Sequence, residues 1–156
     1  MSNISQNLNS NLSKKSSKSY IISQRKKGRI LAFKTLFSYD FDNKDIQSLL
    51  DFSWLEEEYS DIALFYARFL IEGTIKNLNM IDNLIKEKSK NWDFHRISYV
   101  DRAILRFSIF SLLFEKDLDD KIVIDEAIEI AKSFGTEDSY RFVNGILDAI
   151  KKDKRK

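Results

Sequence analysis

The residues best suited to chemistry in this sequence are cations that gather near its beginning. Residues 25–29 read RKKGR, and Lys34 follows five positions later. On a helix, Arg25 and Arg29 lie on one side, whereas Lys27 and Lys34, seven positions apart, lie on another. Cations in the first turn oppose the helix dipole, so the sequence here works against local helix stability. We therefore expect a functional reason for these cations, and phosphate groups are their natural partners.

A second candidate lies near the end of the chain, where Asp138 precedes Phe142 by one helical turn and Gly145 follows. An aromatic ring beside a residue without a side chain can form a stacking surface for a base. A carboxylate can accept a hydrogen bond from a base amino group, as acidic side chains do with cytosine. The alternative is structural, with Phe142 half-packed in the core and Asp138 stabilised by the dipole of the last helix.

The segment from Ser98 to Phe114 is apolar almost all round at helical periodicity, so it should form the central helix of the fold. Ser98 and Asp101 have the spacing of a capping box, which predicts where this helix begins. Arg102 and Arg106 stand one turn apart on this apolar helix. Their positive charges require acidic partners or contact with solvent.

No enzyme motif is present. The sequence has no cysteine and a single histidine, His95, so it lacks the material for a thiolate nucleophile, a zinc site or a catalytic triad. There is no glycine-rich phosphate loop, no Gly-x-Ser-x-Gly elbow and no His-Glu-x-x-His pair. We expect no catalysis, no metal and no cofactor.

The elements that must position these residues are helices. The absence of proline and the presence of only four glycines disfavour strands and tight hairpins. We predict an all-α fold, a compact bundle of about six to seven helices. Gly73, inside a helical pattern, indicates a close crossing by another helix. Gly135 should close one helix in the left-handed conformation and Thr136 should cap the next. The expected helices span residues 24–41, 60–85, 98–114, 121–133 and 137–152, with a short helix or turn within residues 44–55.

Charge and composition predict the domain organisation. Residues 1–22 are a Ser/Asn/Lys-rich extension with few apolar anchors, which we expect to be disordered. Residues 23–152 should form one helical domain, and residues 153–156 a basic tail. The first 39 residues hold eight cations and no acid, whereas residues 40–150 hold thirteen basic and twenty-three acidic residues. This asymmetry suggests a polyanion for the leading segment and a basic protein for the body, unless the lysines only improve solubility.

The sequence shows no signal peptide and no apolar run long enough to cross a bilayer. We therefore expect a cytoplasmic protein that does not use a membrane.

Three segments together resemble the NusB family of bacterial transcription antitermination factors. They are RKKGRILAFKTLFSYDF, VDRAILRFSIFSLLF and IDEAIEIAKSFGTEDSYRFVNGILDAI, and the similarity covers residues from about 24 to 151. The resemblance implies two packed helical sub-bundles and binding to the boxA segment of nascent ribosomal RNA. It also implies pairing with NusE, a small-subunit ribosomal protein, within an antitermination complex on RNA polymerase.

The resemblance also implies which residues bind RNA. The basic motif of the family falls on Arg25, Lys26, Lys27 and Arg29, its acidic residue at the start of the central helix on Asp101, and its Asp and Phe on Asp138 and Phe142. The motif is usually richer in arginine, so affinity here should be lower or more sensitive to salt. Phe37 stands where the family often has Tyr, which leaves packing or stacking without a hydroxyl donor. The expected RNA-binding residues are Arg25, Lys26, Lys27, Arg29, Lys34, Phe37, Asp101, Arg102, Asp138 and Phe142.

The sequence therefore predicts a non-enzymatic antitermination factor that binds boxA RNA together with NusE, with a possible homodimer of the free protein. The alternative is a helical protein–protein adaptor without specific RNA binding, whose lysines only keep it in solution. NusB-like domains also precede RNA methyltransferase domains, but the sequence shows no cofactor-binding domain.

Overall fold

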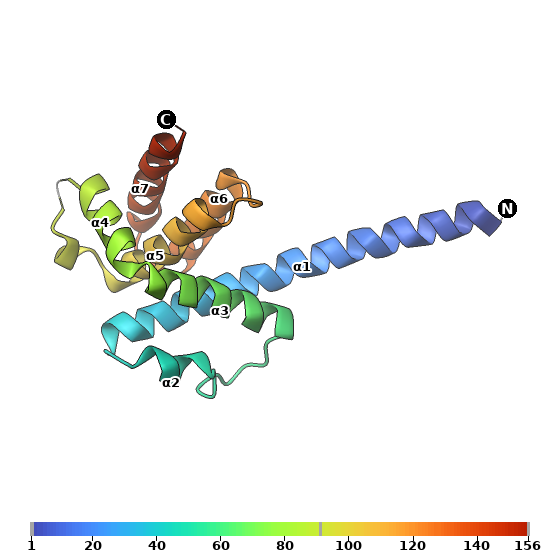
Figure 1. The fold of residues 1–156 in the computed structure, drawn as a ribbon, viewed down its shortest axis with the longest axis horizontal. Helices are drawn as coiled ribbons and strands as arrows, with labels where there is room; N and C mark the ends of the chain where they lie inside the picture. The colour runs from blue at the N-terminus through green and yellow to red at the C-terminus, as the bar shows by residue number, and fades with distance from the viewer. Residues whose placement is uncertain (1, 91, 156) are drawn as a thin grey trace.

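In the computed structural model of the chain, which describes residues 2–90 and 92–155, every regular element is a helix, as predicted (Figure 1). Two groups of helices pack together, α1 to α3 on one side and α4 to α7 on the other, with α5 between them. The α-helices are α1 (Ser2–Phe41), α2 (Ile46–Leu50), α3 (Asp61–Lys76), α4 (Leu78–Lys88), α5 (Tyr99–Phe114), α6 (Asp120–Phe134) and α7 (Ser139–Lys154), and a 3₁₀ helix spans Phe94–Arg96.

Helix α5 is the centre of the fold, as its all-round apolar pattern predicted. It packs against α1, α3, α4, α6 and α7, and every residue from Arg102 to Leu112 is buried. The hydroxyl oxygen of Ser98 accepts a hydrogen bond from the backbone N–H of Asp101 at 3.0 Å, which confirms the predicted beginning of the helix. A buried helix of this kind fixes where its first and last turns lie relative to all of its neighbours.

The two arginines of α5 find their partners inside the protein. Arg102 donates to Asp40 at the end of α1, with its Nε 2.9 Å from the carboxylate. Arg106 donates two hydrogen bonds of 2.9 Å to the two carboxylate oxygens of Asp82 on α4. Arg106 also lies 3.3 Å from Asp40. These pairs tie α1 and α4 to the central helix. Breaking one by removing a single partner would leave a buried charge unpaired.

The helix predicted over residues 60–85 is in fact two helices that meet at Asn77. The Asn77 side-chain amide donates to the carbonyl of Gly73 at 2.8 Å, and this local bond competes with a continuous helix. Gly73 itself behaves as predicted. A Cβ at this position would overlap the ring of Phe110, so glycine allows α3 and α5 to approach closely.

The turn between α6 and α7 differs from the prediction. Gly135 has φ −96° and ψ −171°, an extended conformation rather than a left-handed one. The N-cap of α7 is Asp138, not Thr136, and α7 begins two residues later than expected. The reason is Ser139, whose hydroxyl oxygen accepts a hydrogen bond from the backbone N–H of Thr136 at 3.0 Å. The same oxygen packs so closely on Gly135 that a Cβ at that position would overlap it.

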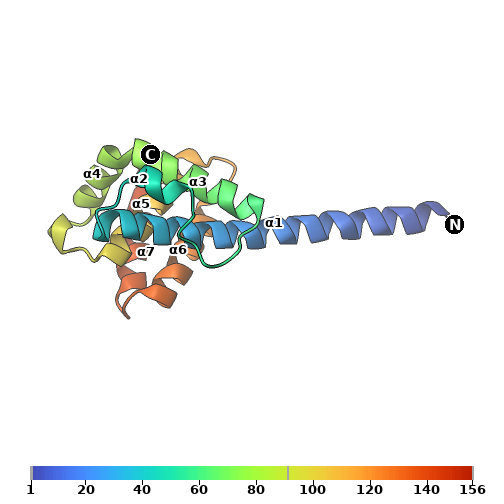
Figure 2. The ribbon, with the colours of Figure 1, turned by 90° about the horizontal axis from the view of Figure 1, so that it is seen from below.

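Helix α1 begins far earlier than residue 24 and projects from the body as a single rod, with the N-terminus at its far end (Figures 1 and 2). Gln24 is the first buried residue among those of α1 whose burial is described. An isolated helix without packing partners is marginally stable in water, so disorder of residues 1–22 in solution stays a prediction. Met1 lies outside the described residues.

The predicted basic tail is partly built into α7. Lys154 donates to the carbonyl of Leu112 at 2.8 Å and to Asp120 at 2.6 Å, and Lys88 pairs with Asp153. The end of α7 is thus attached to α4, α5 and α6, while Lys156 lies outside the described residues. Within the part of the chain that the structure describes, no helix is both long enough and apolar enough to cross a membrane.

Candidate nucleic-acid interface

The first turns of α5 and α7 together form a small cleft of about 250 Å³, which we call the base cleft. It brings together three predicted site residues, Asp101, Asp138 and Phe142, that come from two helices far apart in sequence. The rest of its lining consists of Trp92, Arg96, Ile97, Ser98, Thr136 and Ser139. The cleft therefore combines aromatic rings, carboxylates and a cation, which is the mixture that an unpaired base can use.

Asp101 offers a hydrogen-bond acceptor to this cleft. Its Oδ1 atom is buried and has no hydrogen-bond partner among the described residues. Burial raises the pKa of the Asp101 carboxyl, although the hydroxyl groups of Ser139 and Ser98 partly offset this effect. A buried acceptor without a donor is costly to the folded protein.

The other two predicted residues of the cleft are open to a ligand. Asp138 is exposed at the N-cap of α7, and its side chain makes no capping hydrogen bond. Phe142 is half-buried, and its ring meets the exposed Trp92 edge to face at 5.9 Å between centroids. A Cβ built on Gly145 has no neighbour within 4 Å, so space is open beside this part of α7.

A second cleft, of about 370 Å³, lies between α1, the start of α5 and the end of α6. It contains the predicted residues Lys34 and Phe37, with Val100 and Phe134 opposite them. Val100 and Asp101 are neighbours in the first turn of α5, so the two clefts flank the same turn. Lys27, exposed and seven positions before Lys34, lies on the same side of α1 and extends this surface along the helix.

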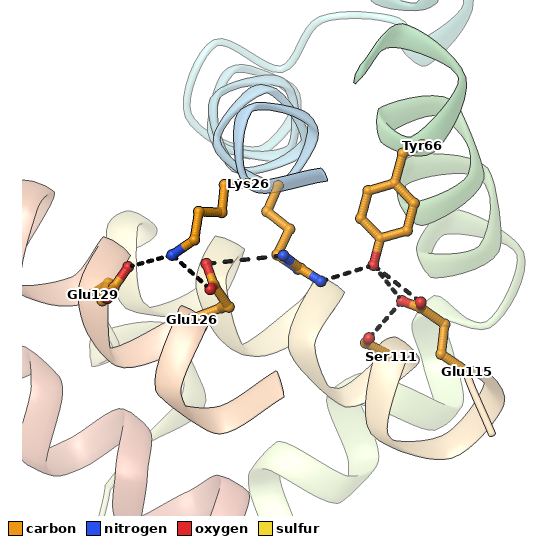
Figure 3. A network of polar contacts seen from close by, with 7 residues as sticks. Lys26, Tyr66, Ser111, Glu115, Glu126 and Glu129 are labelled. Atoms are coloured by element: carbon orange, nitrogen blue, oxygen red, sulfur yellow. Dashed lines mark hydrogen bonds and ion pairs between the residues drawn. The ribbon is translucent and has the colours of Figure 1, made fainter. Parts of the chain in front are cut away.

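Two further cations of the basic motif, Lys26 and Arg29, belong to a polar network that joins four helices (Figure 3), whereas Arg25 is exposed and lies over the Tyr66 ring at 5.4 Å. Lys26 lies 2.9 Å from Glu126 and 3.3 Å from Glu129, both on α6. The hydrogen bond to Glu126 is the largest cause of the raised pKa of Lys26. Arg29 lies 3.8 Å from Glu126.

On its other side, Arg29 donates to the Tyr66 hydroxyl at 3.3 Å, and that hydroxyl donates to Glu115 at 2.8 Å. Ser111 donates to the same carboxylate at 2.6 Å. Burial is the main reason why the pKa of Tyr66 is raised. The network therefore links α1 to α3, α5 and α6, and its Lys26–Glu129 end is exposed to solvent.

Two predicted contact residues are consequently not on the surface where we expected them. Arg29 is 5% exposed and Arg102 is 6% exposed, and both are engaged with residues of the protein itself. Sequence periodicity placed Arg29 at the flank of an apolar stripe but could not reveal the acids that neighbouring helices supply. In this structure both arginines hold helices together.

Several surface residues at this face were not predicted. Trp92 and Arg96 line the base cleft from the connector before α5, where the sequence shows no regular pattern. Tyr99, in the first turn of α5, is 41% exposed and its ring meets Phe41 edge to face at 5.3 Å. The one feature of the sequence that could have indicated these surface residues is the number of aromatic residues close to the start of the central helix.

The opposite end of α5 borders a different surface, an apolar groove of about 700 Å³ between α1, α3 and the α5–α6 loop. Phe65 is 77% exposed there. Phe114 at this groove and Asp101 at the base cleft are roughly 20 Å apart along α5. The groove is lined by Ile21, Arg25, Asp61, Ile62, Phe65, Tyr66, Phe69, Phe114, Glu115, Lys116, Asp117 and Leu118.

Comparison with known proteins gives consistent matches over the body of the chain. The model of the NusB family matches residues 26–152. The transcription antitermination protein NusB of Treponema denticola is 46% identical over 129 residues, which cover 81% of this chain and 95% of that protein. Its counterpart from Leptospira biflexa is 43% identical over 131 residues, with 84% and 94% covered.

Solved structures agree with these matches. The NusB structure from T. maritima superposes with a TM-score of 0.76 at 46% identity, covering 83% of this chain and 91% of that one. A crystal structure of the antitermination factors NusB and NusE in complex with double-stranded RNA superposes with a TM-score of 0.70 at 26% identity, covering 84% and 98%.

Proposed function

The chain belongs to the NusB family of transcription antitermination factors, and from this premise we propose that it binds boxA-type single-stranded RNA of nascent ribosomal transcripts. It does so together with NusE and supports processive transcription by RNA polymerase without catalysing a reaction. The observation that carries this proposal is the base cleft, in which a ring, an unpaired buried acceptor and an exposed carboxylate converge.

This combination suits an unpaired base better than a duplex. A base removed from its stack can lie against the Phe142 ring while its amino group donates to Asp101 or Asp138. Lys34 and Lys27, further along the same surface, are placed for the phosphates that follow. Bases and phosphates are thus assigned to different helices, with α7 and α5 reading bases and α1 holding the backbone.

We assign the apolar groove to the protein partner. The structure that contains NusB with NusE supports such a pairing in a relative. The groove lies at the other end of α5 from the base cleft, so RNA and protein can be held at once. The groove is lined by three acids, Asp61, Glu115 and Asp117, and by two cations, Arg25 and Lys116, so its small net negative charge slightly favours a basic partner. An exposed ring such as Phe65 is the kind of side chain that anchors an interface.

The test of RNA recognition is fluorescence anisotropy with a boxA RNA and a scrambled RNA of equal length, with and without NusE. We expect tighter binding of boxA, strengthened by NusE, and loss of that preference in Phe142→Ala. Phe142→Tyr, which keeps the ring, should retain it. Equal affinity for both RNAs under every condition would leave only the adaptor without specific RNA binding.

The groove is tested separately. Phe65→Gln should abolish the effect of NusE while leaving binding of RNA alone unchanged, because the groove and the base cleft share no lining residue. Ile122→Gln on α6 is the matched control, since Ile122 is exposed and apolar but outside the groove. Sedimentation of the free protein measures self-association, which stays a prediction.

A further inference from the structure

We infer that Glu126 and Glu129 of α6 compete with RNA phosphate for Lys26 and so limit how strongly the basic motif attracts RNA. This inference rests on the proposed function, because it concerns the same interface. The two glutamates, here called the acidic pair, lie on one face of α6 against α1 (Figure 3).

Two carboxylates of α6 lie within ion-pair distance of the Lys26 ammonium group. Its ammonium nitrogen lies 2.9 Å from Oε1 of Glu126 and 3.3 Å from Oε2 of Glu129. The second oxygen of Glu126 faces Arg29 at 3.8 Å. The two cations and the two carboxylates therefore carry no net charge together, and Arg25 and Lys27 are the cations of the motif that form no ion pair with another described residue.

The two cations differ in how easily they can leave the acidic pair. The Arg29 side chain is 6% exposed and also bonded to Tyr66, so its exchange would disrupt packing between α1 and α3. The Lys26 side chain is 43% exposed, and its partner Glu129 is 66% exposed. Exposed ion pairs contribute little to stability, so a phosphate can displace Glu129 at small cost.

The acidic pair thus weakens RNA binding in two ways. It occupies Lys26 in the free protein, and its carboxylates repel phosphates that approach this part of α1. Both effects reduce attraction that depends on charge alone, whereas the acceptors and the ring of the base cleft are unaffected. Glu126 is a positioning residue for Arg29 as well as a competitor, whereas Glu129 is a competitor only.

The experiment measures RNA affinity of full-length Glu129→Gln against Asp125→Asn. Asp125 is exposed on the same helix, and its change removes the same charge without touching Lys26. We expect Glu129→Gln to tighten binding of boxA and scrambled RNA alike by about two- to five-fold, the range set by one exposed ion pair. Asp125→Asn should give a clearly smaller gain, and the gain of Glu129→Gln over Asp125→Asn should shrink when Lys26 is replaced by Met, because only the repulsion of phosphates then remains.

Two results would overturn the inference. One is an equal gain in Glu129→Gln and Asp125→Asn, which would mean that only total charge matters. The other is weaker RNA binding in Glu129→Gln, which would mean that Glu129 supports Lys26 instead of competing with it. Failure of the proposed function would be seen separately, as a wild-type protein that does not prefer boxA over scrambled RNA.

Discussion

At the scale of single residues, the candidate interface depends on polar groups that the fold leaves without internal partners. Asp101 has a buried oxygen with no donor, and Asp138 caps α7 without using its side chain. By contrast, Arg29 and Arg102 are satisfied within the protein. Availability for a ligand therefore depends on whether a polar group has a partner within the protein, and charge alone does not predict it.

Asp101→Asn should raise the stability of the folded protein at neutral pH while it weakens RNA binding. Burial raises the pKa of Asp101 in the folded protein above its value in the unfolded chain, so ionisation of this group costs folding free energy at neutral pH. The cost disappears below the unfolded value of about 3.9, where the carboxyl is protonated in both states.

Urea unfolding should therefore find Asp101→Asn more stable than wild type at neutral pH, with the difference shrinking as the pH approaches about 3.5. Binding of boxA RNA should weaken in the same variant. The exposed control Asp125→Asn isolates the simple loss of charge. A stability difference that does not change with pH would contradict this explanation.

Asp138→Asn tests whether this carboxylate reads a base or only repels phosphate. If it accepts a hydrogen bond from a base amino group, the variant should lose about 1–3 kcal/mol of boxA binding. Glu137→Gln, the adjacent exposed acid, should be neutral or slightly favourable, because only repulsion is removed. Isothermal titration calorimetry with boxA RNA measures both. A gain in Asp138→Asn would mean that its role is confined to the helix terminus.

At the scale of helices, close approach decides the arrangement of α1, α3 and α5. Gly73 lies against the Phe110 ring, and a Cβ on Gly28 would be 2.9 Å from the carbonyl oxygen of Ala63. These two contacts bring α3 against both α5 and α1. The network of Arg29, Tyr66 and Glu115 then crosses the same junction.

Gly73→Ala should destabilise the protein by about 1–3 kcal/mol, since the added methyl group forces the Phe110 ring or a whole helix to move. Gly145→Ala is the matched change on α7, where a Cβ meets open space. It should stabilise by about 0.5–1 kcal/mol through helix propensity alone. Thermal unfolding of both variants is the measurement, and a shift of the same sign in both would refute the packing argument.

At the scale of the whole molecule, the division of the sequence into an acid-free segment and an acidic segment matches the division of the structure into a rod and a body. The acid-free leading segment forms the rod of α1, and the acidic body surrounds α5 (Figure 2). The two ends of α5 border two separate surfaces, the base cleft and the apolar groove. One rigid helix therefore holds the surfaces proposed for RNA and for the protein partner at a fixed separation.

Deletion of residues 1–22 should leave the urea midpoint unchanged, because burial among the described residues begins at Gln24. RNA binding should become less sensitive to salt, since the deletion removes three lysines. Full engagement of all three would lower the slope of log K against log salt by roughly 2. An unchanged slope would mean that these lysines only improve solubility.

The sequence by itself determined the helical class, the central position of residues 98–114 and the close crossing at Gly73. These follow from periodicity, from the absence of proline and from the cost of glycine in a helix, all of which are local properties. The resemblance added Asp101, Asp138 and Phe142 as a group, and only the tertiary structure brought them into one cleft.

Among the described residues, the tertiary structure alone decided which cations have partners within the protein. Lys27 and Lys34 remain open to a ligand, whereas Arg29 and Arg102 are buried against Glu126 and Asp40 from other helices. Long-range ion pairs carry no periodic signal, because the partner of a charge depends on which helices the core brings together. The break at Asn77 and the extended Gly135 escaped prediction for a similar reason, since single side-chain hydrogen bonds decide them.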